Sequence, residues 1–377
     1  MAEHRFENGI LTIVCPENVN SGNAGEWSKE LRALLEEYAP AKVVFDAAAM
    51  NYISSMGLRA ILDIKKKCEE CSVVNASLEI YDIFDMTGFT DILDVKKRLR
   101  EVSIEGCKLI GAGRNGEVYR LSPDTIIKVY NPKNSMEDIE HERELAKLAF
   151  VTGIPTALSF DIVKVGDKTG TLYELLDAKS MAGRMAESEA DFDKELERFT
   201  DLMKEIHSLT IDKKLLTNKK SEAKRWLRDI ENQLDEDVRE KLYQLIEEIP
   251  ESDHIVHGDF HMGNIMEVGD ELNVIDMDTL GYGDSIFELA NLHFTLVGFL
   301  VISPEDDLLE FGYERYLYVW DRIIERYYAE LSEQEKAEKL RKIETLSYIR
   351  LYRYCLRHEN ASHAAAEIKR RLIERVQ

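Results

Sequence analysis

The chain has 377 residues, which is long for one domain, and its apolar fraction of 44% is ordinary for a globular protein with a full core. Its formal net charge is −23, so its surface repels nucleic-acid backbones and anionic lipid, and we expect no nucleic-acid or membrane partner. Scattered cysteines, no apolar leader and no run of about 18 apolar residues predict a cytoplasmic protein without a membrane span.

Residues 1–103 alternate predicted strands and helices, which indicates a small α/β domain. Asn8-Gly9 predicts a hairpin turn between two short strands. Residues 42–46 have a continuous apolar centre, as a buried strand does, and residues 56–70 have the apolar spacing of a helix. Such a unit can bury a core of its own.

Residues 104–176 are rich in predicted strands and contain a glycine-rich segment. Gly111, Gly113 and Gly116 follow the G-x-G-x-x-G spacing. A strand, not a helix, follows the third glycine, which disfavours a dinucleotide-binding βαβ unit. The context favours a glycine-rich hairpin whose backbone amides approach nucleotide phosphates. A structural hairpin without a ligand is the alternative for this motif alone.

Lys128 stands in the middle of an apolar predicted strand, where an unpaired ammonium would lose its hydration. Phosphate oxygens and a carboxylate from the following predicted helix would satisfy it. Glu144 is the favoured carboxylate, and Glu142, on a different face of that helix, is the alternative. A lysine that faces solvent from an edge strand is a further interpretation.

The most informative segment lies in the mostly helical remainder, residues 177–377. Asp259 follows His257, Asn264 comes five residues later, and Asp276 follows a short predicted hairpin. Phosphoryl transfer uses this order: one carboxylate orients or deprotonates the acceptor hydroxyl, while an amide oxygen and a second carboxylate hold Mg²⁺ against the phosphates. We interpret His257 as a packed histidine that shapes the loop.

The segment after Asp276 bears on the acceptor. A helix is predicted soon after Asp284, so no long segment is present of the kind that docks a peptide in protein kinases. This favours a small hydroxyl acceptor, bound between Asp259 and the helices of about 305–360. Acidic residues in that region would suit a cationic acceptor.

Together these motifs resemble the kinase-like fold of the aminoglycoside phosphotransferase and choline kinase family, over residues 104–377. The resemblance implies an α+β bilobal architecture, with a β-rich N-lobe at 104–176 and a helical C-lobe at 177–377, and ATP and Mg²⁺ as cofactors. It implies a hinge from Glu174 to Leu176 whose backbone reads adenine. It also implies a catalytic base and two metal ligands, which are Asp259, Asn264 and Asp276.

Residues 1–103 resemble a STAS domain, the anti-sigma-factor-antagonist fold, through segments 43–46, 52–59 and 80–89. In that family a serine at the start of the second helix is a phosphorylation switch, and Ser55 occupies this place. Ser54 stands where the family has an aspartate. A phosphate on Ser55 would add nearly two negative charges and repel an acidic partner. The alternative is that Ser54 or Ser55 only caps the helix.

The sequence therefore predicts a STAS-like regulatory or interaction domain, with a protein partner, fused to an ATP-dependent phosphotransferase that acts on an alcohol group of a small molecule. The alternative is a signalling module that binds nucleotide and a protein partner or phosphorylates a protein, Ser55 included. A pseudokinase scaffold is disfavoured because four reactive residues are all present, namely Lys128, Asp259, Asn264 and Asp276.

Overall fold

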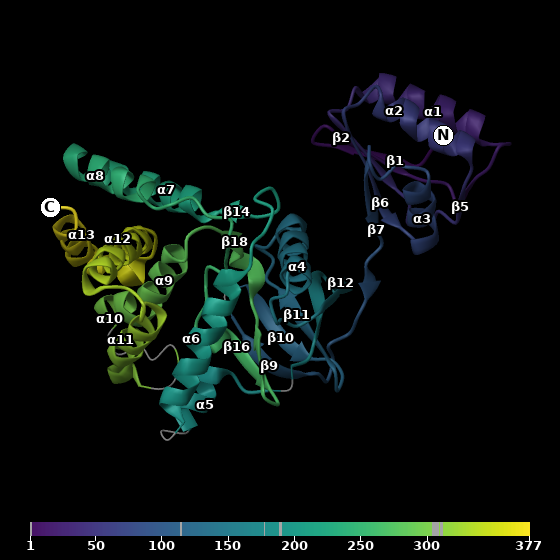
Figure 1. Cartoon of the computed structure of the whole chain (residues 1–377). Helices are drawn as coiled ribbons and strands as arrows, with labels where there is room; N and C mark the ends of the chain where they lie inside the picture. The colour runs from purple at the N-terminus through teal and green to yellow at the C-terminus, as the bar shows by residue number, and fades with distance from the viewer. Residues whose placement is uncertain (1, 114, 177, 188–190, 304–308, 310–311) are drawn as a thin grey trace. The chain divides into compact units, whose positions relative to one another are not determined.

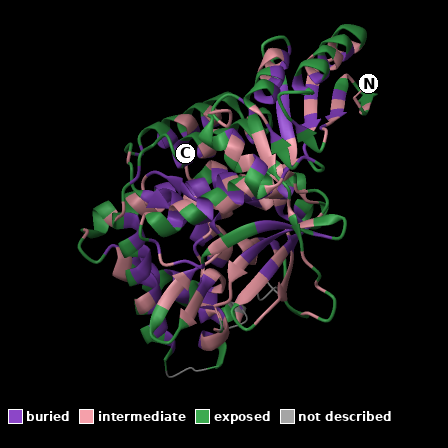
Figure 2. Ribbon diagram, turned by 90° about the vertical axis from the view of Figure 1, so that its right-hand side faces the viewer, coloured by how far each residue is buried: buried purple, intermediate pink, exposed green. Residues whose placement is uncertain are grey.

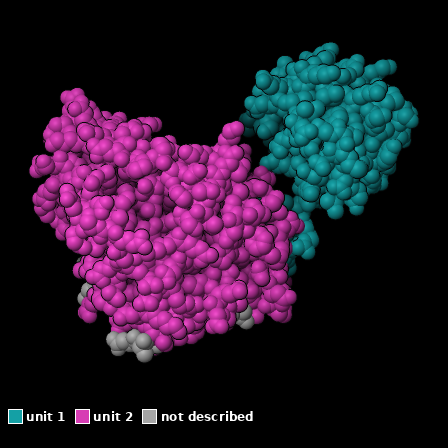
Figure 3. Space-filling view, in the orientation of Figure 1, with its two compact units in different colours: residues 1–103, 162–167 teal, residues 104–161, 168–377 magenta. Residues whose placement is uncertain are grey.

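The computed structural model describes residues 2–113, 115–176, 178–187, 191–303, 309 and 312–377. The chain divides into two compact units, drawn in different colours in Figure 3. Unit 1 comprises residues 1–103 and 162–167, and unit 2 comprises residues 104–161 and 168–377. Within the described residues, no helix combines the length and the apolar character that a membrane span needs.

Unit 1 is built on a mixed sheet with the order β1-β2-β4-β6-β7 (Figure 1). β1 and β2 are antiparallel, and the remaining pairs are parallel. The strands are β1 (His4–Glu7), β2 (Ile10–Val14), β4 (Lys42–Asp46), β6 (Glu70–Ala76) and β7 (Asp94–Lys97). The helices are α1 (Ala24–Tyr38), α2 (Ser55–Lys65) and α3 (Leu78–Met86), and the short β3 (Asn18–Val19) pairs with β5 (Tyr52–Ile53). Residues 162–167 belong to this unit through β12 (Ser159–Val165), whose Val163 pairs with Arg100 of β8 (Arg100–Glu101).

The local sequence explains most of these elements. Asn8 and Gly9 both have positive φ, and the residues flanking them pair across the turn, which confirms the predicted hairpin. The strand at 42–46 is confirmed, with Val43 and Phe45 fully buried. The helix predicted to reach residue 70 was wrong at its end, since α2 stops at Lys65 and Glu70 begins β6.

Ser54, not Ser55, caps helix α2. The Ser54 Oγ accepts a hydrogen bond from the Gly57 backbone N–H at 3.3 Å, and Ser54 has extended backbone angles. Ser55 is the first helical residue, and it is exposed beside the exposed side chains of Tyr52 and Met56. The hydroxyl of Ser55 is therefore not used as the helix cap.

We expect Ser54→Ala to cost about 1 kcal/mol of local stability in α2, because the Gly57 N–H loses its acceptor. Hydrogen exchange of the α2 amides in the full chain should become about fivefold faster. Ser55→Ala is the matched control and should leave exchange unchanged. Equal acceleration of exchange by both variants would contradict the assignment of Ser54 as the helix cap.

The strand-rich part of unit 2, the N-lobe, is an antiparallel sheet covered by one helix. Its strands run in the order β13-β11-β10-β9. Figure 1 shows α4 beside them. The elements are β9 (Lys108–Ala112), β10 (Gly116–Arg120), β11 (Thr125–Tyr130), α4 (Met136–Val151) and β13 (Lys168–Glu174).

The C-lobe follows and is mostly helical, with its buried residues on the inner sides of the helices (Figure 2). Its helices are α5 (Met181–Glu187), α6 (Phe192–Ser208), α7 (Lys219–Ile230), α8 (Glu236–Glu247), α9 (Ile286–His293), α10 (Phe299–Ile302), α11 (Tyr316–Tyr327), α12 (Glu333–Arg357) and α13 (Ala365–Glu374). Its short strands are β14 (Thr217–Asn218), β15 (Ile255–Val256), β16 (Ile265–Val268), β17 (Glu271–Val274) and β18 (Gly281–Tyr282). β16 and β17 form the predicted hairpin.

Candidate active site

A cavity of about 540 Å³ lies within unit 2, between the glycine-rich strands and the loop after β15. It brings together residues that are far apart in the sequence. The predicted residues that line it are Gly111, Gly113, Gly116, Lys128, Glu174, Leu176, Asn264 and Asp276. Its size suits a small-molecule ligand.

Lys128 forms an ion pair with Glu142, so the favoured partner, Glu144, was wrong. The Lys128 Nζ lies 2.7 Å from Glu142 Oε1 and 3.5 Å from Asp276 Oδ1. Glu142 shares the inward face of α4 with buried Ile139, whereas Glu144 lies two residues on, about 200° around the helix, and is exposed. Burial alone would lower the pKa of Lys128, but the Asp276 and Glu142 charges raise it above its ordinary value.

Tyr173, near the end of β13, contacts the same carboxylate oxygen as Lys128. Its hydroxyl donates to Glu142 Oε1 at 3.3 Å, and its side chain lines the cavity beside Glu174. Sequence reasoning missed this contact, because nothing in the local pattern of β13 indicates which strand residue reaches α4.

Asp259 lies in the loop after β15, next to the cavity-lining Asn264, but is not itself among the residues that line the cavity. Its side chain is 34% exposed, and its Oδ2 lies 3.7 Å from His261 Nε2. Burial alone would raise the pKa of Asp259, but the His261 contact and the Arg350 charge outweigh it and lower the pKa to about 2. Asp259 is therefore ionised at neutral pH and can accept a hydrogen bond from a hydroxyl.

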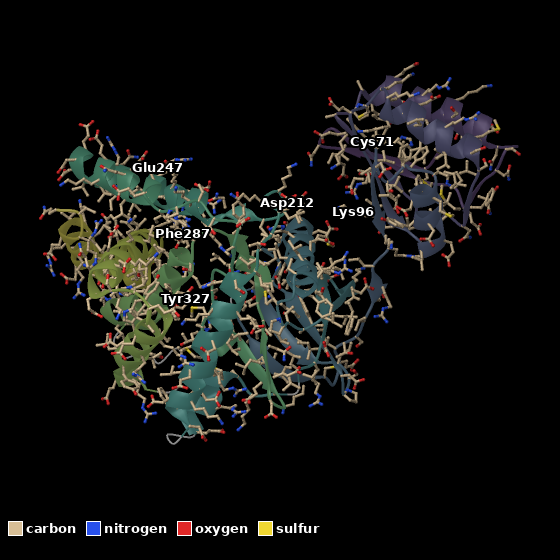
Figure 4. The ribbon with its side chains drawn as sticks, in the orientation of Figure 1. Cys71, Lys96, Asp212, Glu247, Phe287 and Tyr327 are labelled. Carbon is tan, nitrogen blue, oxygen red and sulfur yellow. The ribbon has the colours of Figure 1, made fainter. Side chains whose placement is uncertain are left out.

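A buried carboxylate that the sequence analysis did not single out fixes the Asp259 loop. Glu288 on α9 is fully buried and accepts from the backbone N–H groups of Gly258 and Phe260, at 3.0 and 3.2 Å. His207 Nε2 lies 3.7 Å from Glu288, and its Nδ1 bonds to the hydroxyl of Tyr327, which is labelled in Figure 4. The sequence does contain a signal for this buried carboxylate, because Glu288 interrupts an apolar helical run.

His257 is a packed residue, as its interpretation from sequence required. It is fully buried, its Nε2 lies 3.2 Å from the carbonyl of Ile275, and its Nδ1 accepts from the Asp259 N–H at 3.2 Å. Burial lowers the pKa of His257, so its ring is neutral. It ties the Asp259 loop to the strand that leads into Asp276.

Asn264 precedes β16 and Asp276 follows β17, so both lie at the open end of the hairpin, and both line the cavity. The Asn264 amide donates to the carbonyl of Asp259 at 3.0 Å, which leaves its side-chain oxygen as an acceptor. Asp276 has a φ of 66°, a left-handed conformation that is unusual for a residue with a side chain. Such strain is typical of functional positions.

Asp278 adds a further carboxylate near Asp276. Burial and then the Asp276 charge raise the pKa of Asp278 to about 7, and Asn115 of the glycine-rich segment donates to it at 3.3 Å. Carboxylates that repel one another in this way favour a bound cation. Among the described residues no three His, Cys, Asp or Glu side chains form a metal site by themselves. A site made of Asn264, Asp276, phosphates and water still fits Mg²⁺, which keeps several waters and uses few carboxylates.

The predicted hinge follows β13 directly. Glu174 is the last residue of the strand, and its backbone N–H donates to the carbonyl of Leu158. The backbone N–H of Leu176 has no hydrogen-bond partner within the described part of the chain, and Leu176 lines the cavity. This amide is available to a ligand.

Gly116 is required by close packing of strands. A Cβ added there would lie 2.1 Å from the carbonyl oxygen of Val129, whereas one added at Gly113 would meet nothing within 4 Å. We expect Gly116→Ala to destabilise the protein by about 1–3 kcal/mol in urea unfolding of the full chain. Gly113→Ala is the matched control and should stay close to wild type; similar losses in both would contradict this explanation.

Comparisons with known proteins agree with this architecture. Residues 106–326 match the phosphotransferase enzyme family (APH), and residues 2–102 match the STAS domain. A candidate anti-sigma factor antagonist, BtrV of Bordetella bronchiseptica, is 30% identical over 86 residues, which cover 22% of this chain and 73% of that protein.

Solved structures similar to the chain include ADP-bound aminoglycoside phosphotransferase APH(2″)-Ib, with 18% identity, a TM-score of 0.49 and coverage of 80% of this chain and 99% of that one. A choline/ethanolamine kinase family protein from Mesorhizobium loti has 12% identity, a TM-score of 0.46 and coverage of 72% and 92%. The match over residues 106–326 spans more than half of the chain. The chain therefore belongs to the phosphotransferase enzyme family and carries an N-terminal STAS domain.

Proposed function

We propose that the protein transfers the γ-phosphate of ATP, with Mg²⁺, to a hydroxyl of a small molecule. The observation that carries this proposal is the arrangement around one cavity: the Lys128–Glu142 ion pair on one side, and Asn264 and Asp276 on the other, next to Asp259. A charged amine, an amide oxygen and two separated carboxylates are the groups that phosphoryl transfer needs.

The route from Asp276 to α9 supports a small acceptor. After Asp276 the chain makes one helical turn at 277–279 and enters β18, which is paired on both sides with β14 and β15. Helix α9 begins four residues after β18. No long exposed segment lies here, among residues that the structure describes in full, to hold a polypeptide in extended form.

Each residue has a part in the proposed reaction. Lys128, held by Glu142, neutralises phosphate oxygens, and the amide of Leu176 donates to the adenine. Mg²⁺, held by Asn264 and Asp276, would neutralise charge on the phosphates. Asp259 accepts a hydrogen bond from the acceptor hydroxyl and orients its oxygen toward the γ-phosphorus. A bond forms from that oxygen to phosphorus, the bond to the bridging oxygen of ADP breaks, and the proton passes to Asp259.

We also propose that the STAS domain binds a protein partner through the surface around Ser55. Ser55 is exposed at the start of α2, next to Tyr52 and Met56, whose side chains are 49% and 44% exposed. Exposed apolar side chains around a hydroxyl suit a contact that a phosphate would interrupt. In this proposal the STAS domain carries the regulatory role.

The nucleotide site is tested by ATP binding to the full chain, measured by calorimetry with Mg²⁺. We expect Lys128→Met to weaken binding about tenfold or more, because a buried charge-assisted contact to phosphate is lost. Lys147 on α4 is exposed, so Lys147→Met is the control and should bind like wild type. Equal affinity of the Lys128 variant would contradict the proposed site.

A further inference from the structure

Arg350 on α12 reaches the loop that carries Asp259. Its Nη1 donates to Asn291 Oδ1 at 2.6 Å, and the Asn291 amide donates to the carbonyl of Gly258 at 2.9 Å. The guanidinium is thus one side chain away from the residue that precedes Asp259. α12 packs against α9, which carries Asn291, and against α7, which carries Trp226.

Among the described residues Arg350 has no direct ion-pair partner, although Asp259, Glu222 and Glu288 are near enough for their charges to favour its protonated form. No Asp or Glu oxygen lies within 4.0 Å of it in the part of the chain that the structure describes. Nearby carboxylates are engaged elsewhere: Glu222 lies 2.9 Å from Lys219, and Glu288 holds the loop amides. Other arginines on α12 differ, since Arg353 and Arg357 both pair with Asp229.

Aromatic rings surround the guanidinium. Its Cζ lies 4.4 Å from the ring centroid of Phe294 and 5.5 Å from that of Trp226. Aromatic faces of this kind bind cationic ligands. Here the protein's own cation lies over them, so they are not open to an amine of an acceptor. The cationic acceptor that the sequence suggested therefore has no support at this place.

The electrostatic effect reaches Asp259. The Arg350 charge is among the causes that keep the pKa of Asp259 low, after burial, which acts in the opposite direction, and the His261 contact. A protein of net charge −23 thus places a guanidinium without a direct ion-pair partner, as far as the structure describes the chain, near its acceptor-orienting carboxylate. Guanidinium groups bind carboxylates and phosphates through two parallel hydrogen bonds.

Resting on the proposed function, we infer that the acceptor carries an anionic group, a carboxylate or a phosphate, in addition to its hydroxyl, and that Arg350 binds this group. The distance from Arg350 to the Asp259 loop, through Asn291, then sets which hydroxyl of the acceptor meets Asp259. Arg350 would act as a residue that determines specificity.

The test compares matched hydroxyl compounds as acceptors for the full chain with ATP and Mg²⁺, by ADP release. One series is glycerol, glycerate and glycerol phosphate, and another is glucose, gluconate and glucose phosphate, with glucosamine as the cationic member. We expect an anionic member to have the higher kcat/KM, and the carboxylate and phosphate members distinguish the two sources of charge. Arg350→Gln should lower its kcat/KM by about ten- to hundredfold, mainly through KM.

The variants separate acceptor binding from support of the loop. Arg350→Lys should restore part of the loss, and Arg353→Gln, which removes a paired arginine of the same helix, should change no acceptor preference. A role limited to bracing Asn291 would lower transfer to all acceptors equally, and that result would overturn the inference.

Two further outcomes are decisive. Preference for a neutral or cationic member, or no turnover of any anionic member while ATP still binds, would overturn the inference and leave the nucleotide site standing. Failure of the wild-type chain to bind ATP would instead overturn the proposed function.

Discussion

Asp259→Asn should lower the rate of phosphoryl transfer by roughly 10²- to 10⁴-fold while ATP affinity stays within about threefold of wild type. The substitution keeps the size of the side chain but removes the negative oxygen that orients the acceptor. Because Asp259 lies outside the set of residues that line the cavity, nucleotide binding should survive. The measurement is kcat by ADP release together with the Kd for ATP by calorimetry.

The matched control for this prediction is Asp253→Asn, an exposed aspartate just before β15. It should behave like wild type in both measurements. A kcat for Asp259→Asn within a few-fold of the control would contradict the proposed role of Asp259 in the reaction.

Glu288→Gln should destabilise the protein by about 2–4 kcal/mol and strongly reduce transfer. The carboxylate accepts two backbone N–H groups in a fully buried place, and an amide would point its own N–H at one of them. Unfolding by urea gives the stability, and ADP release gives the activity. Exposed Glu330 supplies the control, Glu330→Gln, which should change neither.

The stability lost in Glu288→Gln should also depend on pH. Burial alone would raise the pKa of Glu288, but the contact with His207 and the hydrogen bond from the Gly258 N–H lower it below its ordinary value of 4.5. A carboxylate with a lowered pKa in the folded state stabilises the fold above its unfolded pKa, and that contribution disappears as the pH falls through the folded pKa. The stability difference between wild type and Glu288→Gln should therefore shrink below about pH 4.5. A difference that stays constant from neutral to acidic pH would contradict the ionised anchor.

Residue spacing predicted the parts of the site that lie on one short stretch of chain. Asp259, Asn264 and Asp276 are close in sequence and joined by a hairpin, so their convergence follows from local structure. The carboxylate that pairs with Lys128 could not be predicted in this way, because its identity depends on which face of α4 is turned inward. Two glutamates on different faces of α4 could both serve, and only the burial of the face that carries Ile139 and Glu142 selects Glu142.

Contacts between distant elements were beyond sequence reasoning. Arg350 lies far along the chain from Asn291, and nothing in the pattern of α12 separates it from Arg353, which forms an ordinary ion pair. The end of α2 was also missed, since Lys66 and Lys67 are good helix formers and only the pairing of Glu70 with Lys42 requires the chain to turn earlier.

The most direct measurement follows the γ-phosphate itself. ATP labelled in the γ position with radioactive phosphorus is incubated with the full chain, Mg²⁺ and the hydroxyl compounds above, and the label is separated into small product, inorganic phosphate and polypeptide. Our account predicts label on a small product with the wild-type chain and none with Asp259→Asn. Label found only as inorganic phosphate or only on polypeptide, Ser55 included, would contradict it.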